Sequence, residues 1–429
     1  MTNIKPFKAT FYNQERIKDP SQVVCPPYDV ISPAGQKYYH QVNPYNLTHI
    51  LLGKDIPGEN KYKRAGTFFR NWLKKKILIQ DDKPAIYFYS HQYNLMGERK
   101  TRLGFIALLR LKDRNSAIFG HEHTHLEAKE DRLRLIKQVR ANLSPIFVTF
   151  LDKKRIIQRV YNRYLQDKEP FIDLVDSEKN NHKLWKLQDK NILERIQVEM
   201  KEENIFIADG HHRYEVACTF REQMKKKYKG AKQSKDYNYI LAYFTNTDSR
   251  GLTILPVHRL LKFRSHIEFD NLRFRLKEYF FVEEIKDKMQ FFFRMQRGGR
   301  TEHLLGMYGN RKYWLLRLKN IKIPDMIITG KSKDYRSLDV AILNHVILEK
   351  IFKVDLKNKK NLLFSPNVDE LIEKVDSDYN SLAFFLNPVK MQQIISVSLS
   401  GERMPPKSTY FYPKVLSGLV INRFNEDKS

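Results

Sequence analysis

The hydrophobic positions of this chain fall into short apolar runs and longer stretches of helical period, and the two kinds alternate. The runs are rich in β-branched and aromatic residues and are bounded by polar turns, which is typical of buried strands. Strands are predicted at 85–90, 104–111, 144–151, 205–208, 239–244, 362–364, 382–386 and 394–398, and in TYFYP near the C-terminus. Helices are predicted at 129–141, 213–226 and 337–352. This alternation predicts an α+β, mixed-sheet, multi-domain protein.

The regularity of this pattern varies along the chain and suggests three regions. Residues 1–60 look irregular and contain the turn CPPYDVISP, whose two prolines fix backbone angles. The stretch 260–335 has the weakest pattern and the most charge, so a boundary is expected there. We expect an N-terminal α/β region at 1–150, a strand-turn-helix core at 151–262, and a C-terminal α+β region at 263–429.

Composition narrows the class of protein. The chain has 429 residues, an apolar fraction of 41% and a net charge of +28, which permits a large core and favours contact with polyanions. The basic residues are spread along the chain, so a diffuse basic surface is favoured over a dedicated nucleic-acid face.

Two cysteines, Cys25 and Cys218, exclude a disulfide framework and a cysteine zinc site. The sequence has no apolar stretch long enough for a membrane span and no secretory signal, so a cytoplasmic protein is expected.

The densest group of polar residues follows the apolar run at 205–208 and reads Asp209, Gly210, His211, His212 and Arg213. A strand, a glycine and a helix together aim backbone N–H groups at an anion. An arginine in the first helical turn can grip a phosphate with two nitrogens. The adjacent histidines point about 100° apart on a helix, which suits separate phosphate contacts better than one metal. The aspartate could bind Mg²⁺ or accept a hydroxyl proton, or it could simply cap the helix.

A second polar group lies near the C-terminus, in GERMPPKSTYFYPK. Lys407, Ser408 and Thr409 offer a cation and two hydroxyls, which suits a phosphate group. The loop lacks the upstream glycines of a Walker A sequence, and a plain basic turn explains it equally well.

A third group is GHEHTHLEAKEDRLRL. His121, His123 and His125 alternate and would share one face of a strand, where zinc could bind, although a surface run is favoured. Glu122 between them is a candidate base.

Three further turns carry polar residues beside apolar segments. CPPYDVI offers Tyr28 and Asp29, and LPVHRL offers His258 and Arg259. RANLSPIF lies between a predicted helix and a predicted strand, and it offers Arg140, Asn142 and Ser144.

These blocks fall in the order found in a large bacterial and archaeal family of unknown function, which the chain resembles from Pro6 to Val420. The D-G-H-H-R block is also similar to that of free-serine kinases on the ParB/sulfiredoxin-like fold. The resemblance implies a nucleotide-binding core that transfers a phosphoryl group from ATP, or from ADP or CTP, to L-serine, with Mg²⁺. One departure stands out, because the family's H-E-R-T reads H-E-H-T here, with His123 in place of the arginine.

The resemblance assigns residues 209–213 to phosphate binding. The kinases take their base from a separate N-terminal segment, for which Asp29 and Glu122 are the candidates here, and Asp209 is the candidate for metal binding or proton transfer. We interpret Lys407, Ser408 and Thr409 as further phosphate contacts, and Arg140, Asn142 and Ser144 as contacts to the small acceptor.

Three functions remain open at this point. The first is a nucleotide-dependent kinase acting on a small hydroxyl-bearing substrate such as L-serine. The second is a ParB-like nucleotide-dependent nucleic-acid binder, which the charge favours but no helix-turn-helix pattern supports. The third is a nucleotide hydrolase or phosphate-binding regulator. A homodimer is compatible with each.

Overall fold

A computed structural model describes residues 1–112, 117–124, 126–228, 236–263, 268–356 and 359–424. The chain forms two compact units. The first comprises Met1–Gly120, Thr124–Thr253 and Pro413–Ser429, and the second comprises His121–His123 and Ile254–Tyr412. The second unit is therefore an insertion in the first. Among the described residues, none of the helices combines the length and the apolar character needed to cross a membrane.

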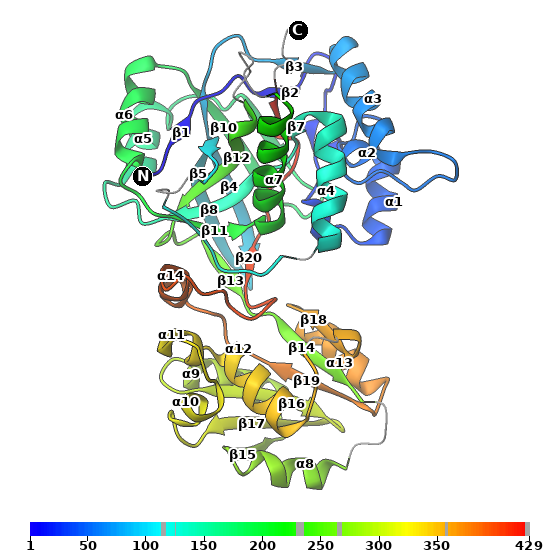
Figure 1. Ribbon diagram of the computed structural model, residues 1–429, viewed down its shortest axis with the longest axis vertical. Helices are drawn as coiled ribbons and strands as arrows, with labels where there is room; N and C mark the ends of the chain where they lie inside the picture. Colours follow the sequence, from blue (N-terminus) through cyan, green and yellow to red (C-terminus); the bar gives the residue numbers. More distant parts are fainter. Residues whose placement is uncertain (113–116, 125, 229–235, 264–267, 357–358, 425–429) are drawn as a thin grey trace. The chain divides into compact units, whose positions relative to one another are not determined.

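The first unit is built on a nine-stranded mixed sheet with the order β6-β11-β8-β12-β5-β4-β10-β9, and β1 pairs with β5 (Figure 1). Its strands are β1 (Ile4–Lys5), β4 (Ile86–Leu95), β5 (Glu98–Arg110), β6 (Ile118–Gly120), β8 (Ile146–Phe150), β9 (Ile172–Val175), β10 (Asn181–Leu187), β11 (Ile205–Asp209) and β12 (Tyr239–Asn246). Two short ribbons pair β2 (Thr10–Tyr12) with β3 (Leu78–Gln80) and β7 (Ala141–Asn142) with β21 (Asn422–Arg423). The sheet joins strands from both of the regions expected at 1–150 and 151–262.

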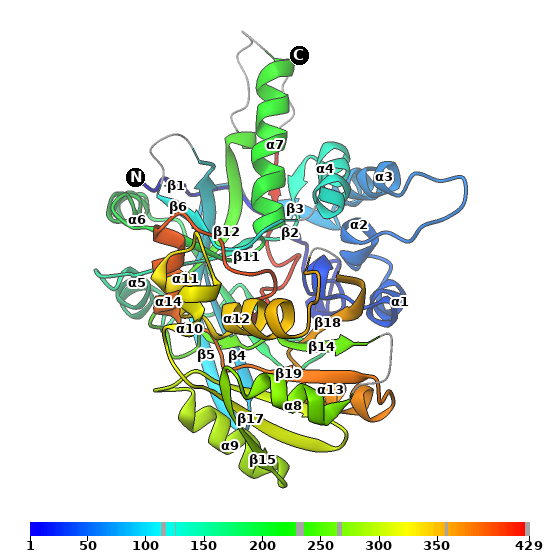
Figure 2. The ribbon, with the colours of Figure 1, turned by 60° about the horizontal axis from the view of Figure 1, so that its bottom comes forward.

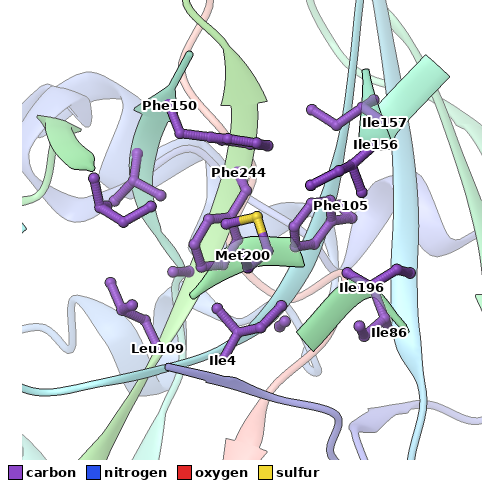
Figure 3. Close-up of a cluster of buried hydrophobic side chains, with 14 of the residues drawn as sticks. Ile4, Ile86, Phe105, Leu109, Phe150, Ile156, Ile157, Ile196, Met200 and Phe244 are labelled. Carbon is purple, nitrogen blue, oxygen red and sulfur yellow. The ribbon is translucent and has the colours of Figure 1, made fainter. Parts of the chain in front are cut away.

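Helices of the first unit lie on this sheet and beside it. They are α1 (Pro33–Val42), α2 (Thr48–Leu51), α3 (Lys61–Lys74), α4 (Leu126–Val139), α5 (Ile156–Tyr164), α6 (Lys190–Met200) and α7 (His211–Lys227), with 3₁₀ turns η1 (Pro20–Gln22), η2 (Tyr28–Val30) and η3 (Asp236–Asn238). Figure 3 shows side chains of α5 and α6, among them Ile156, Ile196 and Met200, packed on Phe105 and Phe244 of the strands. On the other side of the unit α4 lies between α3 and α7 (Figure 1).

The second unit contains a six-stranded antiparallel sheet of order β15-β17-β16-β19-β14-β18. Its strands are β14 (His258–Lys262), β15 (Phe280–Ile285), β16 (Leu304–Gly309), β17 (Lys312–Leu318), β18 (Leu362–Ser365) and β19 (Ser381–Phe385), and β13 (Thr253–Leu255) pairs with β20 (Tyr410–Tyr412). Its helices are α8 (Phe269–Leu276), α9 (Lys288–Gly298), α10 (Ile323–Ile327), α11 (Lys333–Arg336), α12 (Asp339–Ile342), which continues as a π-helix at Leu343–Ile351, α13 (Val368–Asp376) and α14 (Met391–Leu399), with a 3₁₀ turn η5 (Lys359–Asn361). Figure 2 shows α9 and α13 beside this sheet. Side chains of both helices form one core with its strands.

The α+β architecture with mixed sheets is confirmed, and most of the expected elements are present. The prediction of a strand at 394–398 is wrong, because these residues belong to α14. Met391, Ile394, Val397 and Ser398 are the buried positions of that helix, and their spacing is helical, so packing of this face prevails over the strand preference of the short apolar run. Residues 1–60 are also more regular than expected, since Ser32 caps α1 and Pro33 begins it.

Candidate functional site

The turn between β11 and α7 is built as the sequence indicated. Ile205–Ala208 is buried between β6 and β8, and the chain reverses at Gly210 with a φ of +91°. A Cβ atom on Gly210 would lie 3.0 Å from Arg213 Cζ and 3.0 Å from Ile146 Cγ2. The backbone angle therefore favours glycine at this position, and an added Cβ would also make tight contacts with its neighbours.

Asp209 is the anion of a buried cluster. Its Oδ2 lies 2.5 Å from Nη2 of Arg213, and its Oδ1 accepts a hydrogen bond from Nζ of Lys414. The three side chains are only 11–12% exposed. Burial by itself would raise the pKa of Asp209, but the positive charges of Lys414 and Arg213 outweigh that effect and hold it well below its usual range. Asp209 is thus ionised, and it does not cap α7, whose cap residue is Gly210.

The N-terminus of α7 carries positive potential. No side chain caps this helix, and its first intrahelical bond runs from Tyr214 N to Gly210 O at 2.9 Å. The backbone N–H groups of His211, His212 and Arg213 precede that bond, so they lie at the positive end of the helix dipole. Nη1 of Arg213 donates to the Pro145 carbonyl, whereas its buried Nε has no hydrogen-bond partner within the described ranges. This arrangement favours an anion.

A cavity of about 500 Å³, partly open to solvent, lies beside Arg213 and is lined by Tyr28, Arg132, Asn142 and Ser144 among others. Arg132 is buried, donates to the Leu51 carbonyl at 2.7 Å and lies 4.1 Å from the centre of the Tyr28 ring. Burial, followed by the charge of Asp29, raises the pKa of Tyr28 to about 12, although Arg132 and Arg213 act to lower it. Four sequence blocks that lie far apart along the chain therefore meet here.

Of the three residues expected to contact the acceptor, two line this cavity and the third does not. Asn142 and Ser144 line the cavity. Asn142 Oδ1 accepts a hydrogen bond from Asn422 Nδ2 at 3.0 Å. The hydroxyls of Ser144 and Ser417 are hydrogen-bonded to each other at 2.6 Å. Arg140 is not among the residues that line it. Its Nη1 lies 3.0 Å from the sulfur of Met224, and its guanidinium lies over the ring of Phe220.

The remaining expected residues divide between the two units. Asp29 is exposed on η2 of the first unit. Lys407, Ser408, Thr409, His121 and Glu122 belong to the second unit. His125 lies outside the described residues.

In the second unit, the loop at 405–409 is held by a buried arginine. Nη2 of Arg259 donates to the Lys407 carbonyl at 2.9 Å, and burial lowers the pKa of Arg259 to about 9. The Ser408 hydroxyl donates to the Pro405 carbonyl, and Thr409 Oγ1 lies 3.0 Å from Nε2 of His121. The exposed Lys407 is thus presented on a fixed backbone with a φ of +56°.

Sequence reasoning missed two residues of this site, Arg132 and Lys414. Both residues lie inside polar blocks of the sequence analysis. Neither is adjacent in the sequence to the site residue that it contacts. The sequence indicates such partners only indirectly, because a carboxylate at the end of a buried strand, such as Asp209, requires positively charged partners. That requirement indicates a second cation but not its position in the sequence.

A polar network on the sheet of the first unit connects with Lys414. The buried Arg102 donates to the Pro413 carbonyl at 2.8 Å and to Nδ1 of His91 at 3.2 Å. His182 lies between Asp176 and Tyr89, with its Nε2 3.0 Å from Asp176 Oδ2. His91, Asp176 and His182 are the one close group of potential metal ligands in the described part of the chain.

The hydrogen bonds of this network do not fit a metal ion. Since arginine only donates, Nδ1 of His91 must accept, and the ring proton of neutral His91 then sits on Nε2 and blocks it as a ligand. His182 is instead hydrogen-bonded to Asp176 and Tyr89, and His91 to Arg102, whose second bond holds the backbone next to Lys414.

Comparison with known proteins adds the following. Among solved structures, a conserved hypothetical protein from Pyrococcus furiosus matches with 10% identity and a TM-score of 0.34 over 71% of this chain and 92% of that chain. A free serine kinase in complex with AMP matches with 13% identity and a TM-score of 0.33 over 71% and 89%. SbnI with a C-terminal truncation, from Staphylococcus aureus, matches with 10% identity and a TM-score of 0.39 over 76% and 90%. No curated protein matches the chain. The family described as a protein of unknown function (DUF1015) matches residues 4–341, and the chain belongs to this family.

Proposed function

We propose that this protein binds the phosphate groups of a nucleotide at the N-terminus of α7 and transfers one of them to a small hydroxyl-bearing acceptor, with L-serine as the first candidate. The observation that carries the proposal is the cluster in which Arg213 and Lys414 are both held by Asp209 at an uncapped helix N-terminus. Phosphoryl transfer depends on positioned phosphates and neutralised charge more than on covalent chemistry. The resemblance of the D-G-H-H-R block to that of free-serine kinases supports the same assignment.

Within this proposal Asp209 positions the two cations. A carboxylate with a pKa well below its usual range is a weak base, so Asp209 is poorly suited to accept the proton of the acceptor hydroxyl. Asp29 and Glu122 therefore remain the candidates for the base. We assign the acceptor to the cavity lined by Asn142 and Ser144 and leave out Arg140, which is directed at Met224.

Mg²⁺ does not fit Asp209 in this arrangement, because both carboxylate oxygens already accept from cations. ATP, ADP or CTP phosphates do fit, since they would meet Arg213, Lys414 and the first N–H groups of α7. Any magnesium would enter with the nucleotide. We also assign Lys407, Ser408 and Thr409 to nucleotide phosphates, on the ground that the loop presents a cation on a fixed backbone.

The test is a search for a phosphorylated product. The purified chain is incubated with Mg²⁺ and ATP, ADP or CTP in the presence of L-serine, other amino acids and polyols, and products are identified by mass spectrometry. O-phosphoserine is expected. Arg213→Ala should lower nucleotide affinity and turnover, and Arg213→Lys should restore only part, because a point charge cannot replace the two-pronged guanidinium. Lys226→Ala, an exposed cation of the same helix, serves as the matched control.

The outcomes separate the alternatives. Nucleotide hydrolysis without any phosphorylated acceptor would replace the kinase by a nucleotide hydrolase at the same site. Unchanged nucleotide affinity in Arg213→Ala would contradict the phosphate site itself.

A further inference from the structure

A second cavity lies wholly within the second unit and has a different chemistry. It encloses about 630 Å³, part of it open to solvent, and three chain segments line it: 299–303 between α9 and β16, 337–339 at the start of α12, and 387–393 leading into α14. None of these residues belongs to the site proposed above.

The cavity contains a fixed histidine. Nδ1 of His303 lies 2.8 Å from Oδ1 of Asp339, whose side chain is 19% exposed. The carboxylate therefore holds the Nδ1–H tautomer and orients the ring. Nε2 of His303 has no hydrogen-bond partner among the described residues, and the side chain is 24% exposed, so this nitrogen is available to a ligand. Burial raises the pKa of Asp339, although His303 and Lys390 act to lower it.

Positive charge surrounds this histidine. Arg300 and Lys390 both line the cavity and are exposed, and neither forms an ion pair with a carboxylate of the described chain. Glu302, the one other lining carboxylate, lies 2.9 Å from Nε of Arg317 and is thereby neutralised. The first turn of α14 adds the positive end of a nine-residue helix through Lys390 and Gln393.

The walls of the cavity are tightly joined. A Cβ atom on Gly299 would lie 2.1 Å from Nδ2 of Asn387, and that amide donates to the Leu304 carbonyl at 3.0 Å. Lys390 N donates to Gln393 Oε1 at 3.0 Å, which fixes the entry to α14. The backbone of the walls and the His303 ring are thus held in place before any ligand arrives, which lowers the entropic cost of binding.

From this geometry we infer that the cavity is a second ligand site, which binds a small hydroxyl-bearing oxyanion such as hydrogen phosphate. The P–OH group donates to His303 Nε2, and the charged oxygens accept from Lys390 and Arg300. A metal ion would meet two cations, and an apolar ligand would leave the polar lining without partners. The inference does not depend on the nucleotide site at α7.

Inorganic phosphate is the probe, measured by calorimetry in the Arg213→Ala chain so that binding at α7 does not contribute. Saturable binding is expected, and Lys390→Gln and Arg300→Gln should each weaken it by about two- to fivefold, the value of an exposed charged contact. Lys322→Gln, which removes an exposed cation outside the cavity, should leave the affinity unchanged. Because all three side chains are exposed, these variants should fold as the parent does.

The ring resonance of His303 gives an independent measurement. Phosphate should shift it with the same dissociation constant as calorimetry, and acetate, which has less charge and no hydroxyl to donate to Nε2, should bind more weakly. Absence of saturable binding, or equal weakening by Lys322→Gln, would overturn the assignment. Phosphate binding that leaves the His303 resonance unmoved would overturn it too, since the anion would then lie elsewhere.

Discussion

Replacing Asp209 by asparagine tests whether the charge cluster at α7 is as buried and as coupled as its geometry indicates. Asparagine keeps the shape of the side chain but removes its charge, so Arg213 and Lys414 would face each other without an anion. All three side chains are 11–12% exposed. Removing one partner of a buried ion pair costs about 3–5 kcal/mol, so the free energy of unfolding of the first unit should fall by that amount.

The same helix supplies a matched control. Glu222 also contacts one arginine and one lysine, with its Oε1 3.0 Å from Arg221 Nε and 3.2 Å from Lys225 Nζ, but its side chain is 53% exposed. Solvent screens these contacts, so Glu222→Gln should cost less than about 1 kcal/mol. The contrast between the two substitutions isolates burial as the cause, because the partners are of the same kind.

Urea unfolding followed by tryptophan fluorescence measures both variants. Trp72 and Trp185 lie in the first unit and Trp314 in the second, so the series is made in a Trp314→Phe background and reports on the first unit alone. A loss for Asp209→Asn no larger than that for Glu222→Gln would refute the reasoning.

The pH dependence of this difference has a definite sign. The folded-state pKa of Asp209 is lowered, so its stabilisation is fully present above the unfolded pKa of about 4 and is lost as the pH falls through the folded value. The gap between wild type and Asp209→Asn should stay constant from neutral pH to about 5 and shrink only in stronger acid.

Three further predictions follow from the structure and the charge. Gly210→Ala should destabilise the first unit by about 1–3 kcal/mol more than Gly97→Ala, because both glycines have positive φ but only Gly210 has atoms close to the added Cβ, and urea midpoints measure the difference. Arg102→Met should remove the donor to the Pro413 carbonyl and speed amide exchange at Lys414 by about tenfold, and equal rates in both proteins would contradict the link. Duplex DNA should bind weakly, without sequence preference and with a steep loss as salt rises, and anisotropy titrations that show tight selective binding at physiological salt would favour the ParB-like alternative.

The local structure around α7 could be predicted from the sequence because its determinants are adjacent. The apolar run 205–208, the glycine that tolerates positive φ, and the helical spacing beyond it specify the strand, turn and helix without reference to the rest of the chain. The same reasoning failed at 394–398, where a short apolar run fits either a strand or a helix, and packing decides.

The partners within the site could not be predicted in the same way. Lys414 stands 205 positions from Asp209, and its role depends on the insertion topology that returns the chain to the first unit at Pro413. Arg140 shows the converse, since its place in a polar block suggested a ligand contact, whereas its side chain lies against Met224 and Phe220 of α7.

The insertion of the second unit also determines when the site is completed during biosynthesis. The segment Pro413–Ser429 supplies Lys414 to Asp209 and β21 to β7, and it is synthesised after the whole of the second unit. Translation of Ile254–Tyr412 takes roughly 8–30 s at about 5–20 residues per second, and throughout that interval Asp209 has Arg213 but lacks Lys414. The nascent first unit therefore emerges with an incomplete charge cluster, and the segment that follows the second unit completes it.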